Sequence, residues 1–206
     1  MTISRHQPFT GIARQGEADR LGMAVFLASE AMLFGALVLG LLALRGFEPA
    51  AFAATSERLN LLAGSVNTAI LLTSSLLVAI AVEAWRGERA RLAAWMLAIS
   101  ALLGILFLSI KGGEYYQEYG EGLMPGAGPK QDFASAGARM FMDGYFVATG
   151  LHAFHVLVGV ALLAGCSWRL RRDRPPSKVG MANIGLYWHL VDVVWVFLFP
   201  ILYLSR

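Results

Sequence analysis

Five long apolar segments constrain this sequence more than any other feature. They lie at about 21–44, 61–84, 92–110, 140–168 and 183–204. Each is close to the length of about 20 residues that an α-helix needs to cross a bilayer. The segments lack the strict alternation of apolar and polar residues that a membrane β-barrel requires, so helices are the expected spanning form. The sequence therefore predicts an all-α polytopic membrane protein, a bundle of five transmembrane helices.

The remaining composition excludes several other classes of protein. The net charge of +3 comes from short basic loops, and no basic stretch is interleaved with aromatic residues, so no nucleic acid partner is expected. Cys166 is the single cysteine, which excludes a disulfide framework and a cysteine metal site. The first twenty residues are polar, unlike a signal peptide. We therefore expect a polar cytoplasmic tail over residues 1–20 and a five-helix transmembrane domain over residues 21–206.

The basic residues of the loops predict the orientation in the membrane. With five spans, the two ends of the chain lie on opposite sides. The N-terminal tail, the second loop and the fourth loop together hold eleven of the 17 Lys and Arg residues. Because basic residues are enriched in cytoplasmic loops, the N-terminus is predicted to be cytoplasmic.

Ionisable side chains lie within three of the predicted spans, where they are costly and usually face the bundle interior. The first span contains Glu30, the fourth His152 and His155, and the fifth His189 and Asp192. Each pair is three residues apart and so shares one helix face. Counted along the helices, all five lie roughly 8–13 Å from the cytoplasmic face. We predict a single polar cluster in the cytoplasmic half, in which Glu30 meets a histidine of the fourth span.

Three interpretations of this cluster remain open. The carboxyl and imidazole groups could satisfy one another and fix the packing of the helices. They could instead handle protons, because a buried glutamate beside a histidine can titrate near neutral pH. They could also bind zinc, copper or iron, although the HxxH spacing alone is weak evidence for a metal site. No nucleophile elbow, phosphate loop, CxxC or HExxH motif is present, so no catalytic residue and no metal ligand is assigned.

Three further residues are expected to act in helix packing. Asn67, with its neighbours in the second span, is expected to form hydrogen bonds between helices. Trp188 belongs to a last span whose aromatic residues include candidates for membrane-interface anchors. Trp195 lies too deep for that role and is expected to pack against a neighbouring helix. Glu114 follows the third span, where we expect water or lipid headgroups to reach it.

Five segments carry a more specific signal. They are GMAVFLASEAMLFGALV at 22–38, GSVNTAILLTSS at 64–75, GGEYYQ at 112–117, GYFVATGLHAFHVLVG at 144–159 and YWHLVDVVWVFLFPILYL at 187–204. In this order, and over all five spans, they resemble the corresponding segments of subunit III of the haem–copper oxidases. Each fragment alone is a weak match, whereas the combined pattern is specific.

The resemblance implies a non-catalytic accessory subunit without haem or copper of its own. In that family, subunit III packs against the catalytic subunit I, which holds haem and copper, in a complex that also contains subunit II. The complex reduces dioxygen to water and pumps protons across the bacterial inner membrane. Subunit III is expected to stabilise subunit I, to support its proton uptake and to bind phospholipid. Glu30 matches the family glutamate that reacts with carbodiimides.

The predicted spans also differ from part of that family. Mitochondrial-type subunits have seven helices, and the two additional ones form one wall of a lipid cleft. Five-helix forms resemble bacterial versions, which include quinol oxidase subunit III and a protein encoded beside nitric oxide reductase. Both stay open as alternatives. Outside the family, the alternatives are a stand-alone proton-coupled transporter, which an inverted repeat would favour, and a metalloenzyme using His152, His155 and His189.

Overall fold

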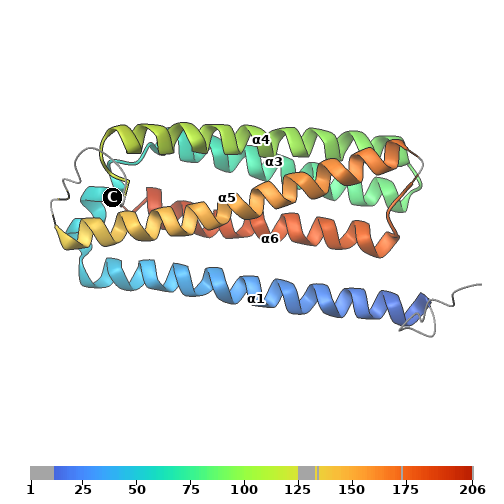
Figure 1. Ribbon diagram of the computed structural model, residues 1–206, viewed down its shortest axis with the longest axis horizontal. Coiled ribbons are helices and arrows are strands. Elements are labelled where there is room, and N and C mark those ends of the chain that lie inside the picture. The colour runs from blue at the N-terminus through green and yellow to red at the C-terminus, as the bar shows by residue number, and fades with distance from the viewer. Residues whose placement is uncertain (1–11, 125–132, 134, 173, 206) are drawn as a thin grey trace, which may run out of the picture.

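Six α-helices make up the computed structural model of this chain, which describes residues 12–124, 133, 135–172 and 174–205. They are α1 (Ile12–Phe47), α2 (Pro49–Ser56), α3 (Leu61–Arg86), α4 (Ala90–Gly120), α5 (Ala136–Arg171) and α6 (Lys178–Tyr203). All except the short α2 are long and apolar enough to cross a membrane, and the described residues contain no strand. The predicted all-α bundle of five transmembrane helices is confirmed (Figure 1).

Polar side chains in the loops determine where three of the spans begin. The side chains of Asn60, Ser135 and Ser177 each accept a hydrogen bond from the backbone N–H three residues later. The distances are 3.1, 3.1 and 2.9 Å. These are N-caps, which satisfy backbone donors that the first turn of a helix leaves without a partner.

Two helices extend well beyond the apolar segments that predicted them. Helix α1 begins at Ile12, so part of the predicted polar tail over residues 1–20 is helical, and residues 1–11 lie outside the described part. Helix α4 continues to Gly120, about ten residues past the predicted end of the third span. Helix α2 was not predicted. Pro49 favours its first turn, and Phe52 packs against Phe141 of α5 with 4.6 Å between ring centroids.

The core of the bundle lies between α3, α4, α5 and α6, while α1 packs at its edge against α6 and α5 (Figure 1). Trp188 of α6 is fully buried in this core, and its Nε1 donates to Ser74 Oγ of α3 at 3.0 Å. Its ring contacts α4 and α5 where each has a glycine, Gly104 and Gly159. Trp188 is therefore a packing residue rather than a membrane-interface anchor.

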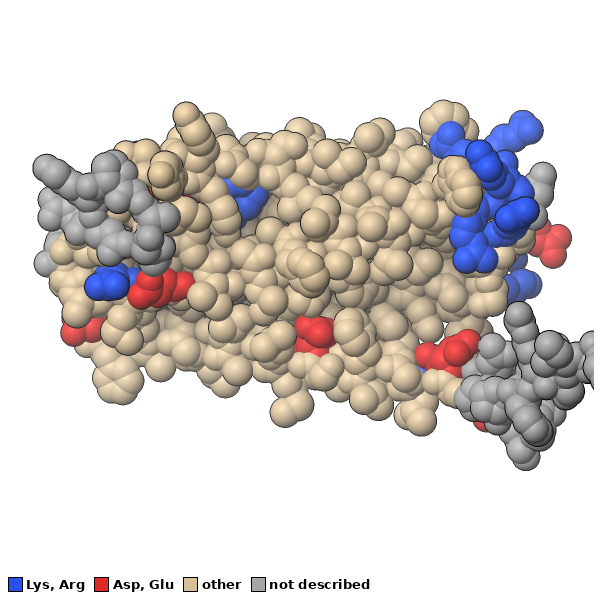
Figure 2. Space-filling model, viewed as in Figure 1, with Lys and Arg blue, Asp and Glu red and all other residues tan. Residues whose placement is uncertain are grey.

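Charged side chains are distributed unequally between the two ends of the bundle. Lys and Arg gather at the end where α1 begins and where α3 is joined to α4 and α5 to α6 (Figure 2). This is the end for which the loops predicted a cytoplasmic location. The orientation itself stays a prediction.

Candidate functional site

The first polar site joins α1 to α5. Glu30 Oε2 lies 3.0 Å from His155 Nε2, and the two side chains are only 15% and 11% exposed. The contact has the distance of an ion pair without the alignment of a hydrogen bond. His155 Nδ1 lies 2.8 Å from the backbone oxygen of Leu151, to which it can only donate. A favourable contact with Glu30 therefore requires a second proton, either on Nε2 or on the carboxyl group.

His152 lies one turn before His155 but has different surroundings. Its ring stacks on Trp195 with 5.2 Å between centroids and meets the edge of Phe107 at 5.6 Å. It is 1% exposed, and among the described residues neither ring nitrogen has a hydrogen-bond partner. His152 thus packs as an aromatic ring in the core, and the structure does not join it to Glu30.

The polar residues of α6 face α3. His189 Nδ1 lies 2.7 Å from Ser75 Oγ. Asp192 is 3% exposed, and its carboxyl group also lies next to the side chain of Ser75 on α3. The five predicted residues therefore divide between the α1–α5 contact, the core and the α3–α6 contact, rather than forming one hydrogen-bonded cluster. The five residues were predicted to form one cluster because they lie at a common depth along their spans, but depth alone does not determine which neighbouring helix each of them faces.

The packing residues of α3 and α6 are partly linked by hydrogen bonds. Trp195 is buried, as expected, and its Nε1 donates to Thr68 Oγ1 at 3.0 Å. Asn67 is fully buried beside Thr68 in sequence, but its amide group has no hydrogen-bond partner in the described part of the chain. At this position the hydrogen bond between the two helices is thus formed by Thr68 rather than by Asn67.

A second polar site lies in the half of the bundle opposite the basic end, and the sequence patterns did not predict it. Lys111 Nζ donates to Glu114 Oε2 at 3.1 Å, to Tyr145 OH at 2.8 Å and to Tyr203 OH at 2.5 Å. Tyr145 OH donates in turn to Glu118 Oε1 at 2.7 Å, and Tyr203 OH donates to Glu114. These five residues, from α4, α5 and α6, are called the Lys111 network below.

The Lys111 network is closed to solvent within the bundle. Lys111, Glu114 and Glu118 are 2%, 5% and 7% exposed, so the expectation that water reaches Glu114 was wrong. The ammonium group uses all three of its N–H donors. It also lies 4.7 Å from the ring centroid of Tyr145 and 5.4 Å from that of Trp195, within the range of cation–π contacts. Hydrogen bonds, ion pairing and aromatic rings together hold one ammonium between two carboxyl groups and offset the cost of its burial.

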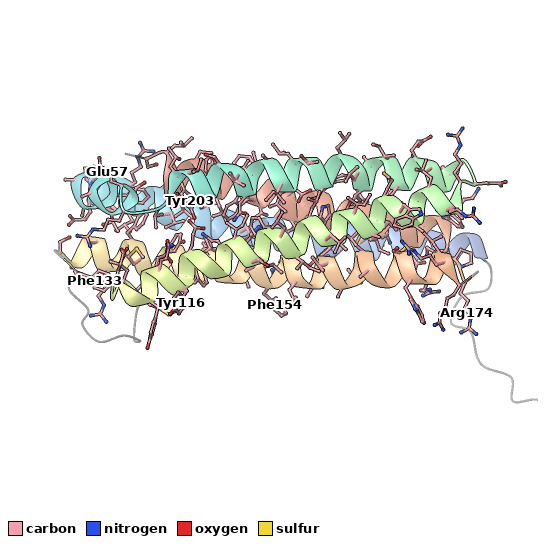
Figure 3. The ribbon with its side chains drawn as sticks, turned by 90° about the horizontal axis from the view of Figure 1, so that it is seen from above. Glu57, Tyr116, Phe133, Phe154, Arg174 and Tyr203 are labelled. Carbon is pink, nitrogen blue, oxygen red and sulfur yellow. The ribbon has the colours of Figure 1, made fainter. Side chains whose placement is uncertain are left out.

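The two ends of the bundle are therefore chemically different. Figure 3 places Tyr203, and with it the Lys111 network, toward the end that carries Phe133, whereas Arg174 lies at the opposite, basic end. Between them, the ring of Trp195 contacts Lys111 on α4 and His152 on α5. No three His, Cys, Asp or Glu side chains among the described residues converge as metal ligands.

Comparisons with known proteins all point to one family of membrane proteins. A sequence model of the family described as cytochrome c oxidase subunit III matches residues 8–205. Cytochrome c oxidase subunit 3 of Thermostichus vulcanus is 35% identical over 192 residues, which cover 89% of this chain and 86% of the relative. The protein of the same name from Synechocystis sp. is 31% identical over 208 residues, 98% of this chain and 82% of the relative. A probable quinol oxidase subunit 3 of Staphylococcus aureus is 30% identical over 193 residues, 92% of this chain and 90% of the relative.

Proposed function

The chain belongs to the cytochrome c oxidase subunit III family, and on this premise we propose that it packs against the catalytic subunit I of its complex and stabilises it. Membership makes the chain an accessory subunit III of a terminal oxidase and a multi-pass protein of the bacterial inner membrane. We further propose that subunit II belongs to the same complex, and that haem and copper reside in subunit I.

The observation that supports this proposal is the contact between Glu30 on α1 and His155 on α5. Among the five spans, α1 is the one least covered by the rest of the chain. Most of the surface of α1 is unpartnered within the chain, with Leu21, Met32 and Leu39 each at least 67% exposed. Lipid alone could cover such a surface. A buried contact between a carboxyl group and an imidazole beside it, in the apolar part of the helix, favours a protein neighbour whose proton uptake the pair supports.

The first experiment is a mild-detergent purification of the tagged full-length chain from its native membrane. An optical spectrum and mass spectrometry of the eluate would identify its partners. We expect haem bands together with a large multi-helix subunit. A colourless protein purifying alone would contradict the proposed partnership and would favour the transporter or metal-site alternative, which transport assays and metal analysis would then separate.

The same eluate distinguishes the alternatives within the family. Among the relatives, one is named a probable quinol oxidase subunit 3, which supports quinol as a second candidate electron donor for the complex. Reduction of the purified complex by quinol rather than by cytochrome c would select that candidate. Copurification of nitric oxide reductase subunits would instead contradict the assignment to an oxygen-reducing complex.

Replacement of Glu30 tests whether its carboxyl group acts in turnover. In Glu30→Ala we expect normal haem content and initial rate, followed by faster loss of activity during prolonged turnover. His189→Gln is the matched control. His189 is also a polar residue within a span, but its side chain contacts Ser75 of α3 rather than Glu30. If Glu30→Ala survived turnover as long as the wild type, the pair would have no functional role.

The two histidines of α5 should differ in their effect on subunit retention. His155→Ala leaves the Glu30 carboxyl group without its partner, and an unsatisfied buried polar group costs about 1–3 kcal/mol. If assembly bears this cost, subunit III should dissociate about 5- to 150-fold more readily during detergent purification. His152→Ala removes only ring contacts with Trp195 and Phe107 and should be retained better. The ratio of subunit III to subunit I on a gel measures both, and equal loss in the two variants would refute the distinction.

A further inference from the structure

Three oxidisable aromatic rings follow one another through the core of the bundle. The ring centroid of Trp195 lies 6.3 Å from that of Tyr203, which lies 6.5 Å from that of Tyr145. All three side chains are at most 1% exposed. Aromatic rings with centroids about 4.5–7 Å apart are in contact. An electron can therefore pass from one ring to the next without crossing a saturated side chain.

The two phenol groups of this series are directed at carboxyl groups. Tyr145 OH donates to Glu118 Oε1 at 2.7 Å, and Tyr203 OH donates to Glu114 Oε1 at 3.1 Å. A tyrosine that loses an electron becomes a strong acid, so its proton leaves readily when an acceptor lies within hydrogen-bond distance. What remains is a neutral tyrosyl radical. Phenylalanine would supply the same ring packing without this route for the proton.

The charges around the rings favour Tyr145 as the side chain that stays oxidised. Trp195 Nε1 donates to a threonine hydroxyl group, which is a poor proton acceptor, so oxidised Trp195 is a cation. Its ring lies 5.4 Å from the ammonium group of Lys111, which repels such a cation. The N–H groups of Lys111 bind Glu114 and the two phenols. Proton uptake by Glu118 therefore breaks no hydrogen bond of the ammonium and creates no second cation beside it.

From these contacts we propose that Trp195, Tyr203 and Tyr145 form an electron-transfer chain that ends in a tyrosyl radical. An oxygen-derived radical takes one electron from Trp195 and is reduced. Tyr203 returns an electron to Trp195, with its proton held by Glu114, and Tyr145 then returns an electron to Tyr203, which recovers that proton. The phenolic proton of Tyr145 moves to Glu118. The biological source of the oxidant rests on the proposed function, because oxygen reduction by the complex would supply it, whereas the chain of rings does not.

The test oxidises the purified full-length chain from the Trp195 side with a photo-oxidant, so its outcome does not depend on the complex. A ruthenium polypyridyl group is attached to the cysteine introduced by Val196→Cys, at a position that follows Trp195 and is 42% exposed. The native thiol is removed by Cys166→Ser. A laser flash with an external quencher generates the oxidant, and electron paramagnetic resonance of rapidly frozen samples identifies the radical. We expect a tyrosyl signal.

Four variants locate the radical and its proton acceptor. Tyr203→Phe interrupts the chain, so the tyrosyl signal should be lost and a tryptophan signal should replace it. Tyr145→Phe and Glu118→Gln should both lose the long-lived part of the tyrosyl signal, because the phenol and its acceptor act as one unit. Tyr115→Phe is the matched control. Its ring centroid also lies 6.3 Å from that of Tyr145, but its OH meets a threonine hydroxyl group at 2.6 Å, so the signal should match the wild type.

A measurement on the wild-type sequence around the rings avoids any damage to folding. In chain exchanged into D2O, the tyrosyl radical should form more slowly, because a proton moves with the electron, whereas oxidation of Trp195 should keep its rate. The proposal is overturned by an undiminished tyrosyl signal in Tyr203→Phe or by equal rates of tyrosyl formation in H2O and D2O. A loss in Tyr115→Phe as large as that in Tyr145→Phe would also overturn it, because the carboxyl partner would then not matter.

Discussion

Lys111→Met is expected to destabilise the isolated subunit in detergent by about 3–5 kcal/mol, the usual cost of removing one partner of a buried ion pair. The substitution retains an apolar stem of similar length but removes the ammonium group. Glu114 and Glu118, both less than 10% exposed, then lose their positive partner. Tyr145 and Tyr203 also lose a hydrogen-bond donor. Thermal unfolding followed by circular dichroism, in one detergent for all variants, measures the effect.

An exposed ion pair provides the control for this substitution. Arg86 and Glu83 lie 3.4 Å apart with side chains 62% and 76% exposed, and such pairs contribute only about 0–1 kcal/mol. Arg86→Met should therefore unfold close to the wild type. Adding Glu114→Gln to Lys111→Met should recover part of the stability, because it removes one of the unpaired carboxylates. If Lys111→Met were as stable as Arg86→Met, the carboxyl groups of the Lys111 network would not need the ammonium group as a partner.

A side chain at Gly159 is expected to separate α5 from α6. A Cβ atom there would lie 2.7 Å from Cε3 and Cζ3 of Trp188, which is too close for any real contact. Trp188 cannot move away easily, because a Cβ at Gly104 on α4 would already lie 2.9 Å from its Cη2. In Gly159→Leu we expect a loss of at least about 1–3 kcal/mol, the range for overpacked cores. Near-ultraviolet circular dichroism should also report the displaced tryptophan.

The matched control for Gly159 lies on the same helix. A Cβ atom at Gly165 would meet no atom of another part of the described chain within 4 Å, so Gly165→Leu adds the same group where there is space for it. Gly165→Leu should unfold near the wild-type temperature with an unchanged tryptophan signal. Equal unfolding of the two variants would assign the effect to helix propensity rather than to packing against Trp188.

The number of spans was predictable because the bilayer imposes a length on every helix, whereas the extent of α4 was not. Hydropathy alone ends the third span near residue 110, because Lys111, Glu114 and Glu118 are each costly in an apolar phase. The structure offsets that cost with partners from α5 and α6, 34 and 92 residues after Lys111. One local signal was present: these three residues continue the buried face of α4, at helical spacing after Gly104 and Phe107.

The polar pairs within the membrane were predictable only in part. Sequence spacing predicted that His152 and His155 share one face of α5, whereas the structure brings only His155 to Glu30. The spacing of residues in the sequence could not show that His152 would face Trp195, or that His189 would meet Ser75 on α3. These outcomes depend on the rotation of each helix about its own axis, which the packing of large side chains such as Trp188 determines.

The Lys111 network also has a consequence for synthesis of the chain. Lys111 leaves the ribosome with Glu114 directly behind it, but Tyr203 follows 92 residues later. At roughly 5–20 residues per second, the interval is on the order of 5–18 s. During this interval the C-terminal end of α4 carries an ammonium group with an incomplete set of partners, so we expect it to stay in contact with water at the membrane surface. We therefore expect the final turns of α4 to settle into the bilayer after α6 has crossed it, so that the last helix to be inserted completes the third span.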